Sequence, residues 1–329
     1  CGGGLSGSTP DERAIAAGKL GKNRANGNIP VLVEAVRNEH QRVQLQAIDA
    51  LGKIGTVEAV AALEQFKDHE ARIIRSAVVQ ALREVLPEAY PEAAKVIEEM
   101  GRDALPLEDG SDPDREVRQA AVTALAVLKQ PSSLDFLLDR LEHDTVEGIR
   151  NAAVKTVGEL NDSRAVEVLE TVYSTDNKKN GAWAIESLGK IGDPAALPVI
   201  REALDSYDPI TRGKAAWALM QIEGDAAAPE LEEALADESD DMPAVVMAHA
   251  LALLGKQEAI PFLEDRVLHA RSPLARAEAA RVLGEVGRPE SLEVLDKAFR
   301  EDRDGLVKRE AGRSARALLK RYPPEDETS

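Results

Sequence analysis

Small and apolar residues recur along this sequence at the spacing of an α-helix. Each recurrence ends in a leucine that is often followed by glycine, as at Leu20-Gly21, Leu51-Gly52, Leu188-Gly189 and Leu283-Gly284. An alanine lies four residues before most of these leucines, and four residues before the alanine lies a residue such as Val43, Ile74, Val117, Ile149 or Val246. Spacings of four and eight place these positions on one stripe of an α-helix. The pattern therefore predicts one amphipathic helix per recurrence.

The recurrences have a nearly constant period. The equivalent positions are Leu20, Leu51, Leu82, Leu125, Val157, Leu188, Leu219, Leu254 and Leu283, with Leu318 as a less regular last member. Most neighbours are 31 or 32 residues apart. The interval that ends at Leu125 is 43 residues, and those on either side of Leu254 are 35 and 29 residues. A period of this kind is typical of a repeat architecture.

A second apolar segment precedes each of these helices. Such segments lie at 29–33, 59–63, 165–169, 196–200 and 259–263. Pro30, Pro198 and Pro261 fall in their first turns, where proline removes no helical hydrogen bond. Two helices per repeat predict an all-α fold, an α-solenoid of about nine helical hairpins. A further helix at 11–22, capped by Thr9 or Asp11, is the predicted N-terminal cap.

The motif within each repeat resembles that of a known family. The segments Val117-Arg118-Gln119-Ala120-Ala121-Val122-Thr123-Ala124-Leu125 and Ile149-Arg150-Asn151-Ala152-Ala153 are similar to HEAT-like repeats of the short subtype first described in phycobilisome lyases. The resemblance extends over residues 11 to 321. It implies the solenoid fold but no single function, because such repeats serve unrelated roles. We expect residues 1–10 to be a flexible lipoprotein-type tether, 11–322 the HEAT-like solenoid and 323–329 a disordered acidic tail.

Cysteine occurs once in the chain, at the first position. Cys1 is followed by a leader rich in glycine and serine, residues 2–8. A cysteine with such a leader resembles the mature N-terminus of a bacterial lipoprotein, in which the thiol carries a diacylglycerol. The resemblance implies that Cys1 is lipidated and anchors the protein to a membrane of the bacterial cell envelope. In such lipoproteins an Asp after the cysteine favours retention in the inner membrane. Because this chain has Gly2 there, the resemblance implies the periplasmic side of the outer membrane. The alternative interpretation is that Cys1 is an arbitrary chain end.

The chain is acidic and poor in aromatic residues. Its 329 residues include 41 Lys and Arg against 59 Asp and Glu, a net charge of −18, and aromatic residues make up 3%. Because this charge repels phosphate backbones, nucleic-acid binding is not expected as a main function. The longest uncharged stretch, 242–255, is shorter than the roughly 20 residues of a membrane-spanning helix. We expect the acidic groups to form a solvated surface.

The sequence contains no recognisable catalytic or metal-binding motif. The histidines at 40, 69, 143, 249 and 269 fall in different repeats, and no metal-ligand spacing, nucleophile motif or phosphate loop occurs. The related deoxyhypusine hydroxylases place His-Glu pairs where this chain has Gln119-Ala120 and Asn151-Ala152. The acidic segment 102–115 lacks the spacing of a calcium-binding EF-hand, so we expect solvated loops there and at 237–241. We predict no enzyme activity, no metal and no cofactor.

An arginine follows the β-branched position in several repeats. The row comprises Arg13, Arg75, Arg118, Arg150, Arg212 and Arg276, and acidic residues precede it, as at Asp68, Asp114, Asp144 and Asp208. One interpretation is a basic stripe for an anionic ligand. We favour the other, a structural ladder of Arg–Asp pairs and helix caps between adjacent repeats.

The second helices of the repeats are expected to line the concave side of the solenoid. Positions one before and two after the central alanine then lie on that side, and both tryptophans of the chain occupy such positions in adjacent repeats. Trp183, Trp217, Lys214 and His249, with Gln221 one turn further on, are predicted to form one patch. Because tryptophan is enriched at interface hot spots, we predict that the patch binds a partner. The alternative is that the indoles fill gaps between repeats.

These features favour a membrane-tethered, non-enzymatic scaffold or accessory subunit. It would bind a protein partner or an envelope complex through its concave face. An alternative from a different class is a tetrapyrrole or bilin lyase, or a cofactor chaperone-like protein, that stacks a flat ligand on Trp183 and Trp217. A third alternative is a soluble cytoplasmic scaffold in which Cys1 has no role.

Overall fold

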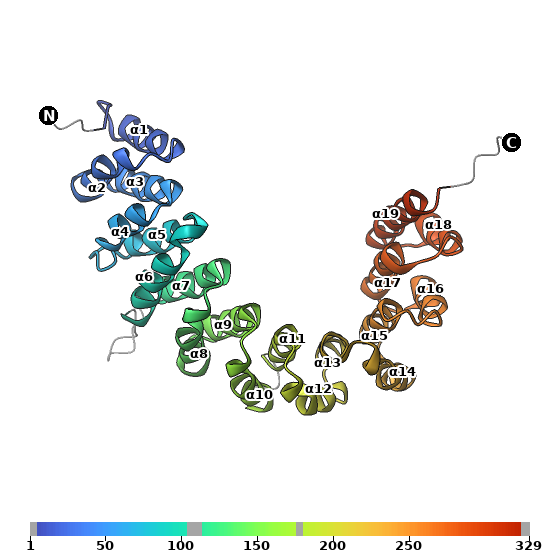
Figure 1. Cartoon of the computed structure of the whole chain (residues 1–329). Coiled ribbons are helices and arrows are strands. Elements are labelled where there is room, and N and C mark those ends of the chain that lie inside the picture. The colour runs from blue at the N-terminus through green and yellow to red at the C-terminus, as the bar shows by residue number, and fades with distance from the viewer. Residues whose placement is uncertain (1–4, 104–113, 176–179, 324–329) are drawn as a thin grey trace. The chain divides into compact units, whose positions relative to one another are not determined.

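The protein is built from stacked helical hairpins (Figure 1). The computed structural model describes residues 5–103, 114–175 and 180–323, and every regular element in these ranges is helical. The chain divides into two units, Cys1–Val168 and Leu169–Ser329, with the boundary inside helix α10 (Val166–Thr175). We call them unit 1 and unit 2.

Unit 1 begins with a single helix and continues with the hairpins α2/α3, α4/α5, α6/α7 and α8/α9. The helices are α1 (Pro10–Lys22), α2 (Ile29–Asn38), α3 (Gln41–Ile54), α4 (Val57–Glu64), α5 (Arg72–Leu82), α6 (Tyr90–Asp103), α7 (Arg115–Leu128), α8 (Leu134–His143) and α9 (Glu147–Leu160). Short 3-10 turns lead into α2, α6 and α8.

Unit 2 continues the same alternation after α10. Its helices are α11 (Gly181–Ile191), α12 (Leu197–Leu204), α13 (Pro209–Glu223), α14 (Ala228–Asp237), α15 (Asp241–Leu253), α16 (Ala259–His269), α17 (Pro273–Val286), α18 (Ser291–Glu301) and α19 (Gly305–Arg321). Within the described residues, the prediction of an α-solenoid with about nine hairpins and an N-terminal cap helix is confirmed.

Local sequence signals set the helix ends. Thr9 caps α1 as predicted: its hydroxyl accepts the Glu12 backbone N–H at 3.2 Å, and the Glu12 carboxylate accepts the Thr9 N–H at 3.2 Å. This reciprocal pair is a capping box. Gly55 and Gly192 end α3 and α11 with φ of 70° and 73°, a left-handed conformation that glycine adopts without steric cost.

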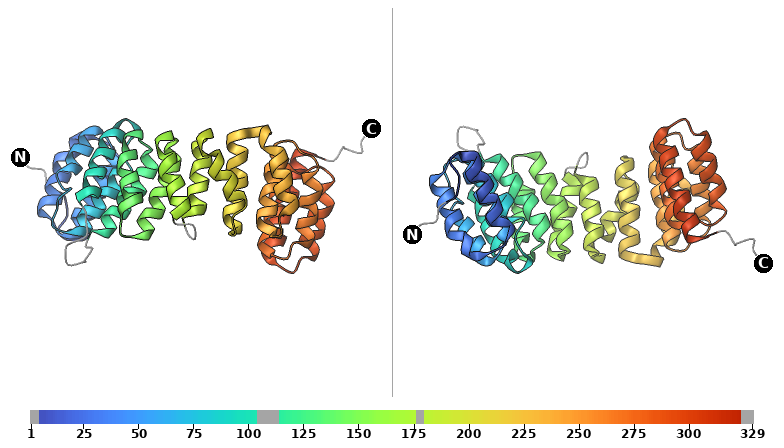
Figure 2. Two further views of the ribbon diagram at one scale, coloured as in Figure 1. Left: turned by 90° about the horizontal axis from the view of Figure 1, so that it is seen from below. Right: turned by 90° about the horizontal axis from the view of Figure 1, so that it is seen from above.

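In each unit, the second helices of the hairpins pack side by side in one layer and the first helices form the other (Figures 1 and 2). The closest approach is at the glycine of the recurring Leu-Gly pair. A Cβ on Gly52 would lie 2.7 Å from the carbonyl oxygen of Ala81 in the next second helix, and one on Gly189 would lie 2.6 Å from the Cβ of Ala218. We call this position the packing glycine; it is occupied by Gly21, Gly52, Gly189 and Gly284.

The register predicted for α15 is wrong by three residues. Leu254 lies beyond the end of α15 and is only partly buried, whereas Leu251 is 2% exposed. Gly255, with φ of 78°, follows Leu251 by four residues, just as the left-handed Gly55 follows Leu51. Leu251 is therefore the equivalent of the other recurring leucines.

The corrected register restores a regular period and changes the place of one candidate residue. Leu251 lies 32 residues from Leu219 and 32 from Leu283, so the intervals of 35 and 29 disappear. His249 is then equivalent to Trp217, since each lies two residues before the leucine of its helix. Counted from Leu254, His249 instead falls one residue before the central Ala250, the position that Trp183 and Lys214 occupy in their helices.

The row of arginines forms a structural ladder between adjacent repeats. Arg13, Arg118, Arg212 and Arg276 each donate to an acidic side chain 26 residues later, namely Glu39, Asp144, Glu238 and Asp302. The same arginines or their equivalents also donate to a carbonyl oxygen six residues earlier, for example Arg212 to Ser206 at 2.9 Å. Each arginine thereby links its own interhelical loop to the next repeat, as the structural interpretation predicted.

The ladder includes one buried ion pair. Arg118 and Asp144 are both fully buried side chains, and the Nε of Arg118 lies 2.8 Å from Oδ2 of Asp144. In unit 2, the hydrogen bond from Arg276 lowers the pKa of Asp302. Asp208 serves as a cap, because its carboxylate accepts the backbone N–H of Thr211 at 2.9 Å.

Some sequence predictions concern segments outside the described residues. Cys1, most of the acidic segment 102–115 and the tail from 324 onward belong to them, so the tether and tail boundaries stay predictions. At the loop 237–241, Ser239 and Asp240 are exposed as expected, whereas the Glu238 side chain is buried against Arg212. Among the described helices, none combines the length and apolar character needed to cross a membrane.

Candidate functional site

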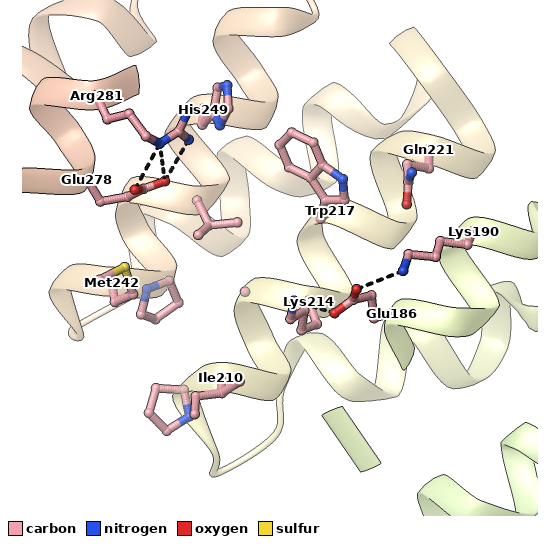
Figure 3. A pocket seen from close by; sticks show the side chains of 14 residues that line it. Glu186, Lys190, Ile210, Lys214, Trp217, Gln221, Met242, His249, Glu278 and Arg281 are labelled. Carbon is pink, nitrogen blue, oxygen red and sulfur yellow. Dashed lines mark hydrogen bonds and ion pairs between the residues drawn. The ribbon is translucent and has the colours of Figure 1, made fainter. Parts of the chain in front are cut away.

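A cavity of about 380 Å³ opens on the second-helix layer of unit 2 (Figure 3). Its walls come from α11, α13, α15 and α17, with α13 and α15 contributing most of them. Because the repeats are stacked in register, residues at equivalent positions of consecutive helices become neighbours across the layer. The cavity therefore combines short sequence segments that are about one repeat apart.

Trp217 and His249 meet at the centre of this site. Their ring centroids are 5.1 Å apart and the planes are tilted by 46°, within the range of attractive aromatic contacts. Trp217 is half-buried and His249 is 6% exposed. The indole N–H of Trp217 makes no hydrogen bond to any described residue, so it is available to a ligand.

One side of the cavity is a cluster of ion pairs around Glu186. Its carboxylate pairs with Lys190 at 3.1 Å and with Lys214 (Figure 3). Burial opposes ionisation of Glu186, but the hydrogen bonds from the two lysines lower its pKa below the ordinary value. The Nζ of Lys214 also lies 5.2 Å from the centre of the Trp183 ring, a cation–π distance.

The opposite side carries a second set of ion pairs, on α17. Arg281 pairs with Glu278 at 2.7 Å and with Glu285 at 3.4 Å. The Nε2 atom of His249 lies 3.4 Å from the Glu285 carboxylate but makes no hydrogen bond within the described chain. Burial lowers the pKa of His249, and Glu285 offsets this only in part. His249 is therefore neutral at pH 7.

The remaining wall is apolar and partly open to water. Ile210, at the start of α13, is 63% exposed, and Met242, at the start of α15, is 38% exposed. Both line the cavity together with Val246 and Pro243. Apolar side chains that line an accessible cavity beside a half-buried tryptophan are typical of the core of a binding surface.

The sequence pattern of HEAT repeats matches residues 4–83, 105–181, 172–246 and 243–316, which is most of the chain. The chain belongs to the HEAT repeat family. The predicted HEAT-like repeats are thereby confirmed, and the lipoprotein-like N-terminus stays a prediction. No curated protein matches the chain in sequence.

Several solved structures are similar to this HEAT repeat protein. Importin beta has 15% identity and a TM-score of 0.57, with 95% of this chain and 51% of importin beta covered. Kap121p bound to Nup53p has 12% identity and a TM-score of 0.55, with 95% and 40% covered. The CpcE–CpcF complex of phycocyanin lyase from Nostoc has 22% identity and a TM-score of 0.39, with 76% and 91% covered. At these identities, importin beta and Kap121p show the solenoid fold alone.

The cavity brings together most, but not all, of the predicted site residues. Trp217, Lys214, Gln221 and His249 line it. Trp183 does not line it and lies behind Lys214, to which it is linked by the cation–π contact. Whether these residues bind a partner stays a prediction.

Sequence reasoning missed the charged and apolar walls. Glu186, Glu278 and Arg281 lie one before or two after the central alanine of their helices, as the tryptophans do, but the predicted patch does not include them. It does not include Ile210 and Met242 either. The misassigned register of α15 concealed the alignment of Met242 with Ile210, since each immediately precedes the first buried position of its helix. Gly255, read as the end of α15, was the signal that would have corrected it.

The arrangement offers apolar and polar surfaces that a ligand can contact. The described residues contain no group of three or more His, Cys, Asp or Glu side chains placed to hold a metal ion. The charged groups at the rim neutralise each other, which leaves the indole N–H of Trp217, the amide of Gln221 and the apolar wall to contact a ligand. These HEAT repeats therefore present a pocket with few directional polar groups.

Proposed function

We propose that this HEAT repeat protein is a non-enzymatic scaffold that binds a protein partner through the second-helix layer of unit 2. The proposal is carried by one observation, the Trp217–His249 pair at the base of an open, partly apolar cavity. Half-buried tryptophans surrounded by water-excluding neighbours dominate the binding energy of many protein interfaces. HEAT repeat solenoids bind proteins, and the structure of Kap121p with Nup53p is one such complex.

The distribution of charge around the cavity favours a protein segment over a small ion. Lys214 and Lys190 already form ion pairs with Glu186, and Arg281 forms one with Glu278. A free anion or cation would have to break these pairs. An apolar side chain of a partner, by contrast, gains contact with Trp217 and the α13–α15 wall and leaves the pairs as a polar rim.

We further propose that a lipid on Cys1 holds the scaffold at a membrane of the bacterial envelope. Support comes from the sequence only, namely the single cysteine and the glycine- and serine-rich leader. Two or more acyl chains give stable anchoring, whereas one chain gives weak and reversible anchoring. Mass spectrometry of the native N-terminal peptide tests this proposal: an acylated Cys1 is expected, and an unmodified thiol contradicts it.

The alternative of a flat ligand held by both tryptophans receives no specific support from the geometry. Trp183 is covered by Lys214, and only Trp217 lines the cavity. The two indoles therefore do not form opposite walls of one slot. A tetrapyrrole lyase or cofactor chaperone would require such a slot or an equivalent stacking surface.

Site-specific photo-cross-linking in the source cells tests the proposed binding surface. A photoreactive phenylalanine analogue replaces the exposed Gln221, and the matched control places it at the exposed Glu293 of α18. We expect one discrete cross-linked protein from position 221 and none of the same mass from position 293. The product should be lost when Trp217→Ala is added, because the anchor of the interface is then missing. An identical product from both positions contradicts the proposal.

A further inference from the structure

The last helix of this acidic protein carries a continuous stripe of cations. In α19, Arg309, Arg313, Arg316 and Lys320 are exposed and follow one another at intervals of four, three and four residues. Such intervals place all four side chains on one face of the helix. At a rise of 1.5 Å per residue, this face is about 16 Å long. We call these four residues the α19 stripe.

None of the four cations has a partner. Within the described residues, Arg309, Arg313, Arg316 and Lys320 make no ion pair and no hydrogen bond. Several arginines elsewhere in unit 2 are paired, for example Arg201 with Glu223 and Glu230 at 2.6 and 3.0 Å. The chain has 59 acidic residues for 41 basic ones, so the unpaired stripe does not reflect a shortage of carboxylates.

The stripe occupies the surface that other second helices use for stacking. Ala50 meets Gly21 of the preceding second helix, and it lies two residues before the packing glycine Gly52. Ser314 meets Gly284 in the same way, and the residue two positions later is Arg316. Arg316 therefore stands at the packing-glycine position, the surface on which the other second helices receive their neighbour.

An exposed helix face needs only polar side chains to stay soluble, and mixed charges meet that need. The α19 stripe instead places four cations three or four residues apart, where like charges repel one another. Glu310, the single carboxylate of α19, has no ion pair with the stripe. The helix thus holds an unfavourable concentration of positive charge that an anionic partner would relieve.

We propose that the α19 stripe is a docking surface for a carboxylate-rich, extended segment of another protein. Three of the four cations are arginines, whose planar guanidinium group binds carboxylates with two parallel hydrogen bonds. Successive cations are about 4.5 to 6 Å apart along the helix axis. Alternate side chains of an extended chain are about 6.6 Å apart on one side. Acidic residues at alternate positions of the segment therefore face successive cations.

The surroundings of the stripe favour a protein segment over a membrane surface. Val307, Ala311 and Leu318 of α19 are buried against the preceding repeat, whereas Leu319, which is 46% exposed, is the one large apolar side chain that α19 exposes, and it lies to one side of the stripe. The stripe itself contains no apolar side chain that would enter a lipid headgroup region. Membrane-surface helices instead bury an apolar face and direct their cations to its edges.

Fluorescence anisotropy with the full-length chain tests this proposal. The probe is a labelled peptide of alternating glutamate and serine, and the reference peptide has glutamine in place of glutamate. The test variant is Arg313→Gln with Arg316→Gln. The matched control is Lys297→Gln with Arg303→Gln, which removes two exposed, unpaired cations of unit 2 from outside the stripe.

We expect the parent to bind the acidic peptide and not the glutamine peptide at low ionic strength. The stripe variant should bind about tenfold more weakly and the control variant less than about twofold, because each exposed pair contributes up to about 1 kcal/mol. Binding should weaken at about 0.15 M salt, where charges are screened beyond about 8 Å. The stripe variant should melt close to the parent, since the relieved repulsion between the cations offsets the lost attraction between Glu310 and Arg313.

Three outcomes would overturn the proposal. The first is an equal loss of binding in the stripe and control variants, which would mean a response to net charge alone. The second is peptide binding that appears only after residues 324–329 are removed, because the occupant would then be the acidic end of this chain. The third is stripe-dependent binding to phosphatidylserine vesicles without binding to the peptide, which would assign the surface to lipid.

Discussion

Trp217 and His249 are neighbours because each lies two residues before the last buried leucine of its helix. In a stacked repeat, such equivalent residues of adjacent second helices become contacts. The rarity of tryptophan in the sequence was enough to predict one half of this pair. His249 was included on a register counted from Leu254 instead of Leu251. Both residues are leucines, and a shift of about one helical turn keeps the apolar side chains on the same stripe, so the error was not visible in the sequence pattern.

The buried position of His249 predicts a pH-dependent stability. Burial lowers its pKa in the folded state, with Glu285 raising it and Arg281 lowering it from α17. The unfolded chain therefore binds the proton at a higher pH than the folded chain does. The contribution of neutral His249 to the free energy of unfolding is therefore full above the unfolded-state pKa of about 6.5. It decreases as the pH falls below that value. Melting curves between pH 8 and 5 should show this loss in the parent and less of it in His249→Gln.

The buried ladder pair in unit 1 predicts a large effect of a single arginine. Arg118→Ala removes the guanidinium that lies 2.8 Å from the buried Asp144 carboxylate and leaves it only the more distant Arg140, at 3.6 Å, so we expect a loss of up to about 3–5 kcal/mol. The matched control is Arg42→Ala, which removes an exposed pair with Asp11 and should cost less than about 1 kcal/mol. Urea unfolding followed by circular dichroism measures both values. Equal losses would contradict the structural role given to the ladder.

At the scale of the helix, the repeated Leu-Gly pair was visible in the sequence but its reason was not. The packing glycine is not required by backbone conformation, since Gly52 and Gly189 are inside helices. It is required because the next second helix passes within contact distance of the missing Cβ. Sequence periodicity indicates a shared position, whereas a contact between repeats becomes visible only in three dimensions.

The packing glycine gives a prediction with a control of opposite sign. Gly52→Ala places a Cβ 2.7 Å from the Ala81 carbonyl oxygen. Overpacking costs about 1–3 kcal/mol, against a gain of about 1 kcal/mol from helix propensity, so we expect a net loss of up to roughly 2 kcal/mol. Gly148→Ala, on an exposed turn of α9 with its nearest neighbour at 3.8 Å, should be neutral or stabilising. Urea unfolding midpoints, compared with that of the parent, should be lower for Gly52→Ala and equal or higher for Gly148→Ala.

For the whole molecule, the sequence predicted the architecture better than the binding surfaces. Each hairpin contacts mainly its neighbours, so the fold follows from the period and the apolar stripe. The cavity of unit 2 depends on four helices in the correct register, and an error in one helix obscured its walls. The α19 stripe was hidden for another reason, because a net charge of −18 says nothing about where the minority of cations gather.

The two proposed surfaces also serve different parts of one scaffold. The cavity can bind an apolar side chain, and the row of cations in the α19 stripe can bind an extended acidic segment. A partner that contacts both surfaces would bind with higher overall affinity, because its second contact forms within the complex already held by the first. The cross-linked protein recovered from position 221 is therefore expected to contain an acidic segment in addition to its apolar anchor.

The affinity of that purified partner for Trp217→Ala tests the central claim most directly. Isothermal titration calorimetry compares the parent, Trp217→Ala and Phe299→Ala, which truncates an aromatic side chain 49% exposed on α18. If Trp217 anchors the interface, its variant should lose at least about 2 kcal/mol of binding free energy, roughly 30-fold in affinity, while Phe299→Ala binds like the parent. Unchanged affinity of Trp217→Ala, with only a lower melting temperature, would mean that the indole fills space between repeats and would contradict the account.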